Sequence, residues 1–269
     1  MDKKAVIGFV GFGNMARAIA GGLKGSALGE SCELAAYNPT LSKITDFGGV
    51  RACESSALVA RGADYLFICV KPQQLEAAFA ELRGGLRERQ VLISIVAGVS
   101  GERLRELAQK DVVVVRTMPD TPLLVGCGAT AIARPDGISD ADYDFVREIF
   151  RQSGEVYEIP GDKFDEVIPV AGSGVALLFR LARLISDKAA ESGLDRETSV
   201  RMFAKALEGA AAMLERSGRD ALELETMVCS KGGTTLAMLD KLGEYDFNAA
   251  VGAAYDACVN RAKELGRNR

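Results

Sequence analysis

The stretch that decides the fold is Ala5-Val6-Ile7-Gly8-Phe9-Val10, followed at once by Gly11-Phe12-Gly13-Asn14-Met15-Ala16. The first six residues predict a buried strand, and the apolar pattern after the glycines predicts a helix. In such a turn the first glycine permits a sharp bend, the second lets a pyrophosphate approach the backbone, and the small third residue lets the helix pack on the strand. The stretch therefore predicts dinucleotide binding, with a plain packing turn as the alternative.

Short apolar runs alternate with helical stretches up to about residue 160. The expected strands are Ala5–Val10, Glu33–Tyr37, Tyr65–Val70, Val91–Ile95, Val112–Arg116 and Ala129–Ala133. The expected helices are Met15–Lys24, Leu41–Phe47, Ser55–Arg61, Gln73–Arg83, Gly101–Gln109 and Asp140–Gln152. This alternation predicts an α/β Rossmann domain over residues 1–160, with a doubly wound and mostly parallel sheet.

Residues 161–269 carry no strand pattern and predict an all-α domain. Asp195, Asp220 and Asp246 each precede a helical stretch as candidate N-caps. The segment has much apolar surface for its length, so we expect it to complete its core against a second subunit.

Composition and charge limit the chemistry. The 269 residues include 37 acidic and 33 basic side chains, so the net charge is −4, and no dense basic block suggests nucleic acid. The longest unbroken apolar runs are too short to span a bilayer, and the first residues lack a signal-peptide pattern, so we expect a cytoplasmic protein. The chain has no histidine, which excludes imidazole acid–base chemistry, and the cysteines have no metal-ligand spacing, so no metal site is predicted.

The end of the second expected strand indicates which dinucleotide binds. NAD-selective sites place a carboxylate there to hold the ribose 2′-hydroxyl. This strand instead ends at Asn38, and Thr40, Ser42 and Lys43 can donate hydrogen bonds to a 2′-phosphate. The pattern favours NADPH; NADH stays possible because Asn38 tolerates both, and a solvated Asn-Pro turn is the alternative interpretation.

Two further loops follow expected strands. They are Val70-Lys71-Pro72-Gln73 and Ala97-Gly98-Val99. Ligands of open α/β sheets bind outside the carboxyl ends of the strands, so both loops are candidates for lining the cofactor pocket.

Several motifs together resemble one family, pyrroline-5-carboxylate reductase. Besides the stretches above, they are Arg116-Thr117-Met118-Pro119-Asp120-Thr121-Pro122, Val125-Gly126-Cys127-Gly128-Ala129-Thr130, Gly172-Ser173-Gly174 and Ser230-Lys231-Gly232-Gly233-Thr234-Thr235. The resemblance covers essentially the whole chain in order. It implies a Rossmann domain followed by a helical domain that interlocks in a homodimer, often within a larger oligomer. It also implies reduction of the cyclic imine Δ1-pyrroline-5-carboxylate to L-proline with NAD(P)H.

The resemblance also implies site residues. Cofactor contacts would come from Gly11 to Ala16, Asn38, Ser56, Val70 to Gln73 and Ala97 to Val99. The substrate loop would comprise Val228, Ser230, Lys231, Gly232, Gly233, Thr234 and Thr235, with Thr235 as the catalytic residue near the ring nitrogen.

Five residues depart from the family pattern near the expected substrate position: Asp120, Ile168, Ala171, Val175 and Lys231. Lys231 stands where the family has a proline; it either binds an acidic group or faces solvent. Asp120 either caps a turn or adds a negative charge that favours an iminium.

The departures leave two alternatives open: a reductase of another imine acid, and a non-catalytic NADP(H)-binding paralogue with a regulatory or scaffold role. A β-hydroxyacid dehydrogenase is disfavoured because Phe179 stands where that class carries its catalytic lysine.

Overall fold

The computed structural model describes residues 4–267, which form two compact units. The first unit contains the described residues up to Ser173 together with those from Cys258 onward, and the second is Gly174–Ala257. The segment before Ser173 belongs to the first unit because it packs against its sheet. The domain boundary expected between residues 160 and 161 stays a prediction.

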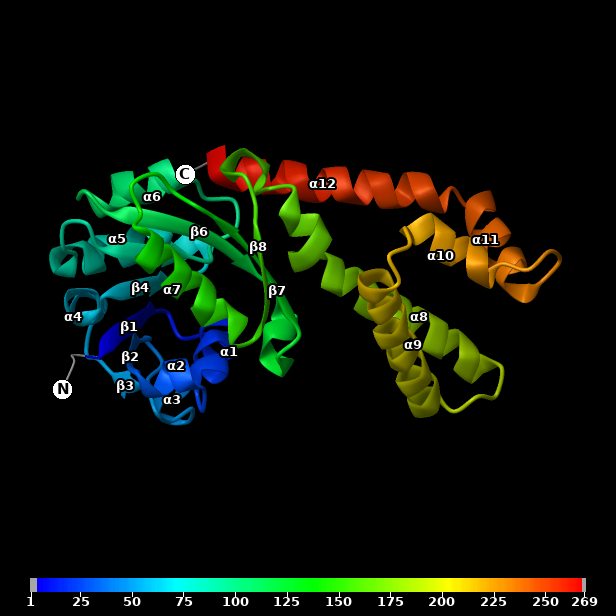
Figure 1. Ribbon diagram of the computed structural model, residues 1–269, viewed down its shortest axis with the longest axis horizontal. Coiled ribbons are helices and arrows are strands. Elements are labelled where there is room, and N and C mark those ends of the chain that lie inside the picture. The colour runs from blue at the N-terminus through cyan, green and yellow to red at the C-terminus, as the bar shows by residue number, and fades with distance from the viewer. Residues whose placement is uncertain (1–3, 268–269) are drawn as a thin grey trace. The chain divides into compact units, whose positions relative to one another are not determined.

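One eight-stranded sheet forms the centre of the first unit (Figure 1). Its order is β3-β2-β1-β4-β5-β6-β7-β8, and each pairing is parallel except β6 with β7. The strands are β1 Ala5–Val10, β2 Cys32–Tyr37, β3 Arg51–Ala52, β4 Tyr65–Ile68, β5 Val91–Ser94, β6 Val113–Pro119, β7 Gly128–Ala133 and β8 Gly154–Glu158. The predicted doubly wound, mostly parallel sheet is confirmed.

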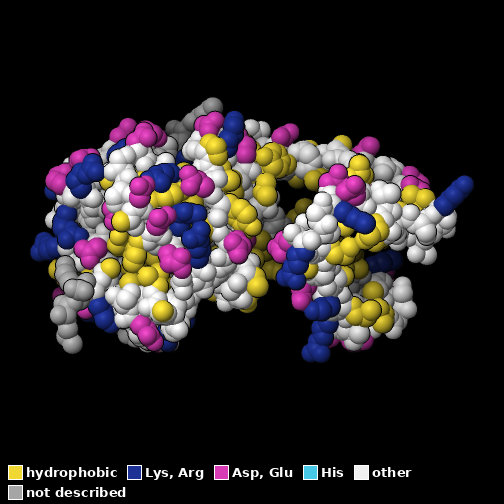
Figure 2. Space-filling view, viewed as in Figure 1, with side chains coloured by type: hydrophobic (Ala, Val, Ile, Leu, Met, Phe, Trp, Pro, Cys, Tyr) yellow, Lys and Arg dark blue, Asp and Glu magenta, His cyan; other side chains and the backbone are white. Residues whose placement is uncertain are grey.

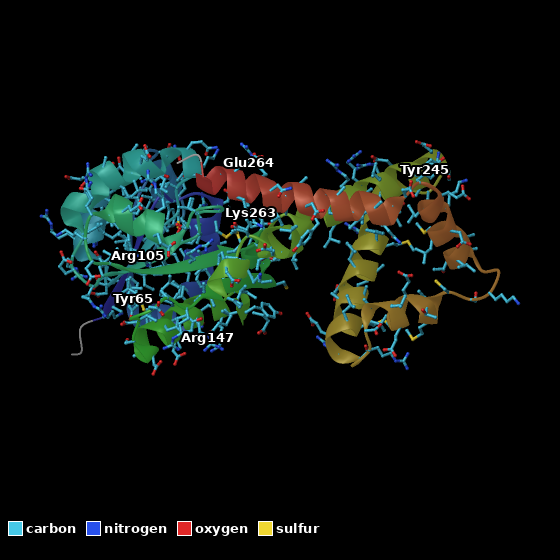
Figure 3. The ribbon with its side chains drawn as sticks, turned by 90° about the horizontal axis from the view of Figure 1, so that it is seen from above. Tyr65, Arg105, Arg147, Tyr245, Lys263 and Glu264 are labelled. Atoms are coloured by element: carbon cyan, nitrogen blue, oxygen red, sulfur yellow. The ribbon has the colours of Figure 1, made fainter. Side chains whose placement is uncertain are left out.

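Helices cover both faces of this sheet, as its apolar strands require. They are α1 Asn14–Leu23, α2 Ala27–Glu30, α3 Ser42–Thr45, α4 Ser56–Gly62, α5 Leu75–Leu82, α6 Gly101–Ala108 and α7 Asp140–Arg151. Residues of β4 alternate between the faces: Phe67 packs in the core cluster of α1 and α7, and Leu66 and Ile68 pack in that of α4, α5 and α6. The Tyr65 hydroxyl donates to Asp142 Oδ1 at 2.8 Å and links β4 to α7 (Figure 3).

Short helical turns connect several of these elements. They are the 3₁₀ turns η1 Pro72–Gln74, η2 Arg83–Gly85, η3 Thr121–Val125 and η4 Gly161–Lys163, and the π-helical turn η5 Ile168–Gly172. Pro169 lies in η5, directly before the first long helix of the second unit.

The second unit contains α8 Gly174–Glu191, α9 Arg196–Arg216, α10 Ala221–Val228, α11 Thr234–Glu244 and the larger part of α12 Phe247–Arg267. Two expected caps are confirmed. The Asp195 side chain accepts from Thr198 N at 2.8 Å, and Asp220 forms a capping box with Glu223. Each cap satisfies backbone N–H groups that a helix start leaves unpaired.

This second unit has almost no core of its own. Within Gly174–Ala257 only Ser186 and Ser199 are buried, while large apolar side chains such as Phe179 (68% exposed) and Leu222 (69%) face outward. Hydrophobic side chains are visible on the surface of these helices in Figure 2. Exposed apolar surface of this extent is typical of an interaction site.

One helical stretch, Ile168–Glu191, is long and apolar enough to cross a membrane by length and composition. We expected no membrane-spanning stretch because the unbroken apolar runs are short. That expectation missed this helix, because charged residues interrupt its apolar runs without ending it. Arg180 and Arg183 lie near the middle of the stretch, where each arginine would cost about 2.5–3.5 kcal/mol in a bilayer. This cost favours a protein partner as the cover.

Candidate functional site

The turn after β1 has a backbone that only glycine fits at its first position. Gly11 has φ +86°, and a Cβ built there would lie 2.7 Å from the carbonyl oxygen of Cys69. The Gly11 N–H donates to the Tyr37 carbonyl at 2.9 Å. The turn is thus fixed between the ends of β2 and β4.

Gly13, unlike Gly11, is not required by the backbone. Its φ of −86° suits any residue, and a Cβ built there meets nothing within 4 Å. Gly13 is the N-cap of α1, no side chain caps this helix start, and no acidic residue lies in its first turn. Free N–H groups beside open space fit the pyrophosphate of a dinucleotide.

Asn38 holds the turn from the neighbouring strand. Its Oδ1 accepts from the Phe12 N–H at 3.1 Å, and its Nδ2 donates to the Thr40 carbonyl at 3.0 Å. Thr40 and Lys43 are exposed beside it, and the segment 38–43 contains no carboxylate. This arrangement fits a 2′-phosphate, and it gives Asn38 a structural role that the sequence did not reveal.

The remaining cofactor candidates follow β4 and β5 at the same sheet edge. Cys69 N–H donates to the Val10 carbonyl at 2.8 Å, which sets the loop Val70–Gln73 beside the glycine turn. Lys71 and Gln73 are exposed, and Gly98 is buried. The structure thus brings the predicted loops of β1, β2, β4 and β5 together, and their contacts with a cofactor stay predictions.

Ser56 is a polar candidate whose side chain is buried. It begins α4, its N–H donates to Glu81 Oε1 at 3.2 Å, and its hydroxyl has no hydrogen-bond partner among the residues that the structure describes.

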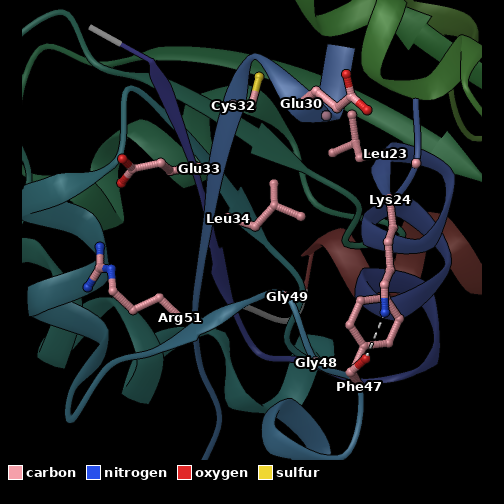
Figure 4. Close-up of a pocket in the computed structure, with 12 residues that line it drawn as sticks. Leu23, Lys24, Glu30, Cys32, Glu33, Leu34, Phe47, Gly48, Gly49 and Arg51 are labelled. Carbon is pink, nitrogen blue, oxygen red and sulfur yellow. Dashed lines mark hydrogen bonds between the residues drawn. The ribbon is translucent and has the colours of Figure 1, made fainter. Parts of the chain in front are cut away.

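A pocket of about 430 Å³ lies away from these loops (Figure 4). It is lined by the end of α1, the start of β2 around Cys32, and Phe47–Gly49. Lys24 Nζ donates across it to the Phe47 carbonyl at 3.3 Å. Because Cys32 opens β2 and Tyr37 closes it, the pocket flanks the amino end of the strand, opposite to the glycine turn.

Asp120 does not cap the turn that follows it, which was one of the two roles expected for it. It follows β6, is 6% exposed, and its Oδ1 accepts from the Ala129 N–H at 3.0 Å; it makes no side-chain cap to η3. Burial raises the pKa of its carboxyl, and the backbone hydrogen bonds oppose that rise. Asp120 therefore ties the end of β6 to the start of β7.

The predicted substrate loop lies in the second unit, after α10. Gly232 has φ +71°, and the Gly233 N–H donates to the Ser230 carbonyl at 2.9 Å. Gly233 then caps α11 without a side-chain hydrogen bond, Thr234 and Thr235 form its first turn, and that turn holds no acidic residue. An uncapped helix start of this kind suits a carboxylate. Lys231 and Val228 are exposed beside it.

Comparison with known proteins adds the family. The family described as pyrroline-5-carboxylate reductase dimerisation matches residues 161–265, and the one described as NADP oxidoreductase coenzyme F420-dependent matches residues 6–98. Pyrroline-5-carboxylate reductase of Escherichia coli is 34% identical over 100% of both chains. The enzyme of that name from Arabidopsis thaliana is 30% identical, covering 97% of this chain and 96% of its own.

The chain belongs to the pyrroline-5-carboxylate reductase family. The fold agrees: the crystal structure of the Plasmodium falciparum pyrroline carboxylate reductase with NADP bound has a TM-score of 0.89, 26% identity and 99% coverage of both chains. The family resemblance predicted from the motifs is confirmed. NADP fits the open start of α1 and the segment after β2.

The sequence did not reveal the residues that pack against the turn and the loop at the expected cofactor-binding edge of the sheet. The Cys69 carbonyl limits Gly11, and backbone atoms of α12 lie against Gly98. Only the glycine at each position signalled these contacts, because the partner in each case is a backbone atom and carries no side-chain pattern.

The two turn glycines should respond differently to substitution. Gly13→Val should fold as the wild type does, because its Cβ meets open space, but should lose NADPH affinity at least about a hundredfold by filling the pyrophosphate position. Gly11→Val should destabilise the protein even without cofactor, by about 1–3 kcal/mol of backbone strain plus a clash. Thermal denaturation and NADPH fluorescence titration measure the two effects. Retained NADPH affinity in Gly13→Val would contradict the assignment.

The Asp120 carboxyl should make stability depend on pH. Its pKa is raised in the folded state, so its contribution to stability is fully present at low pH and is lost as the pH rises through that pKa. Asp120→Asn keeps the acceptor for Ala129 and cannot ionise. We expect it to raise the melting temperature by a few degrees at about pH 8 and by less at about pH 4. An equal change at both pH values would contradict the buried-carboxyl interpretation.

Proposed function

We propose that this chain reduces Δ1-pyrroline-5-carboxylate to L-proline with NADPH. The observation that carries the proposal is the full-length similarity to reductases of that name, with the uncapped, open helix start at Gly13 at the place where a dinucleotide needs it. The missing carboxylate between residues 38 and 43 favours NADPH over NADH.

The first unit binds and orients the cofactor in this proposal. N–H groups at the start of α1 hold the pyrophosphate, and Asn38, Thr40 and Lys43 hold the 2′-phosphate, while Lys71 lies at the same edge. When bound, the cofactor supplies a hydride. The residues of the chain position the cofactor and the substrate and provide the electrostatic environment of the site.

The helix start at Gly233 holds the substrate carboxylate, and the Thr235 hydroxyl orients the ring nitrogen. The chain has no histidine, so no imidazole can donate the proton. A cyclic imine that is already protonated carries this proton itself. Hydride addition to the C=N carbon of that iminium gives the neutral secondary amine, and atoms and charge balance without a protein acid.

We further propose that residues 161–269 form the dimerisation and substrate domain of a homodimer in the cytoplasm. The match of residues 161–265 to the dimerisation family and the exposed apolar helices of Gly174–Ala257 support the dimer. Assembly beyond a dimer stays a prediction.

The test is to mix the protein with NADPH and pyrroline-5-carboxylate, follow the nicotinamide absorbance, and identify proline in the product. We expect stoichiometric NADPH consumption and proline formation. NADPH binding without consumption would overturn the proposal and favour the binding-protein alternative. Consumption only with another imine acid, which the exposed cation Lys231 allows, would redirect the substrate assignment.

Thr235 variants test the residue roles within that assay. Thr235→Ala should lower kcat at least about tenfold and leave NADPH affinity within about twofold of wild type. Thr235→Ser keeps the hydroxyl and serves as the matched control with near wild-type turnover. Equal turnover in Thr235→Ala would remove Thr235 from the mechanism.

Asn38→Asp should shift the cofactor preference from NADPH towards NADH. Asn38→Asp keeps an oxygen to accept from Phe12 N–H but adds a negative charge beside the 2′-phosphate, so NADPH affinity should fall at least about tenfold relative to NADH. Asn38→Ala removes the acceptor without adding charge and should weaken both cofactors alike. Kd values for both cofactors measure this; an unchanged ratio in Asn38→Asp would exclude the assignment.

A further inference from the structure

The last turns of α12 pack on a loop that the cofactor is expected to contact. Most of α12 is exposed, but Val259 and Ala262 are buried. Ala262 belongs to a core cluster with Met118 and Ile168, and Ala97 packs against that cluster. The end of the helix is therefore built into the nucleotide-binding unit.

The contact with the loop joins backbone to backbone. Gly98 has φ +71°, and a Cβ built on it would lie 2.7 Å from the Ala262 carbonyl oxygen. A Cβ built on Gly266 would lie 2.5 Å from the Gly98 carbonyl oxygen. Two glycines thus set the separation of helix and loop, and neither position has room for a side chain.

Two side-chain contacts fasten the same part of α12. Lys263 Nζ lies 3.2 Å from Glu166 Oε1, and Cys258 Sγ donates to Ser173 Oγ at 3.4 Å. Lys263 and its neighbour Glu264 are labelled on the helix in Figure 3. The helix end is held along its length, so its position limits where Gly98 can lie.

We propose that Gly266 and Ala262 are positioning residues for the nicotinamide dinucleotide: they fix the loop Ala97–Val99 in its cofactor-binding shape without touching the cofactor. The proposal rests on the proposed function, because it needs that loop to contact NADPH.

The test uses Gly266→Ala and Gly266→Val in the full chain. Alanine favours helix over glycine by about 1 kcal/mol in a helix interior and by less near a helix end, so a purely helical effect would be neutral or stabilising. The added Cβ must instead move the Gly98 carbonyl. We expect the Kd for NADPH to rise about tenfold in Gly266→Ala, equivalent to about 1.4 kcal/mol, and further in Gly266→Val. At saturating NADPH, kcat should stay within about twofold of wild type.

Glu264→Ala is the matched control. This side chain is exposed two residues away and pairs only with Arg261 on the surface in the described contacts, so its loss should leave Kd unchanged. If Gly266→Val does not fold, Gly266→Ala carries the test. An unchanged Kd in a folded Gly266→Ala, with or without a lower melting temperature, overturns the proposal. Wild-type protein that binds no NADPH would instead overturn the proposed function.

Discussion

The close approach of the first turn to its neighbours is the constraint on which the cofactor edge depends. Gly11 packs on the Cys69 carbonyl, and its N–H donates to the Tyr37 carbonyl. The Phe12 N–H donates to Asn38 Oδ1. Three strand ends therefore fix one turn. Because α1 starts directly after it, the same contacts aim the free N–H groups of the helix start. The anion-binding geometry is thus a consequence of strand order β2-β1-β4.

The helical unit differs from the first unit because its own helices bury very few side chains. A unit of this length that buries only Ser186 and Ser199 gains little from its own hydrophobic burial. Two of its helices, α9 and α10, have side-chain N-caps, but caps contribute only about 1 kcal/mol each. In the proposed homodimer, the second chain covers this apolar surface. Folding and assembly are then one equilibrium, and stability depends on protein concentration.

Much of the first unit could be predicted from the sequence, because six strands carry near-continuous apolar runs. The prediction missed β3, which has only Arg51 and Ala52, and β8, whose Gly154–Glu158 carries two glutamates; both are edge strands, which need not be apolar. The glycine turn and Asn38 were found because their motif is local. The α12 contact with Gly98 was not, since it joins residues far apart in the chain and its shortest approach is to a backbone atom. Asp120 was ambiguous because its partner, Ala129, lies on another strand.

Three of the five departures from the family pattern fall into two physical classes. Ile168 and Asp120 lie buried in the first unit: Ile168 adds apolar contact with the cluster around Met118, and the Asp120 carboxyl accepts a hydrogen bond from the Ala129 N–H. Lys231 is exposed beside an uncapped helix start with no acidic residue in its first turn. A cation at that place adds to the partial positive charge of the helix and can only strengthen attraction for an anion. In the proposed substrate site, Lys231 is therefore the change whose physical effect falls on the bound molecule rather than on the fold, and it acts in the direction that an imine acid requires.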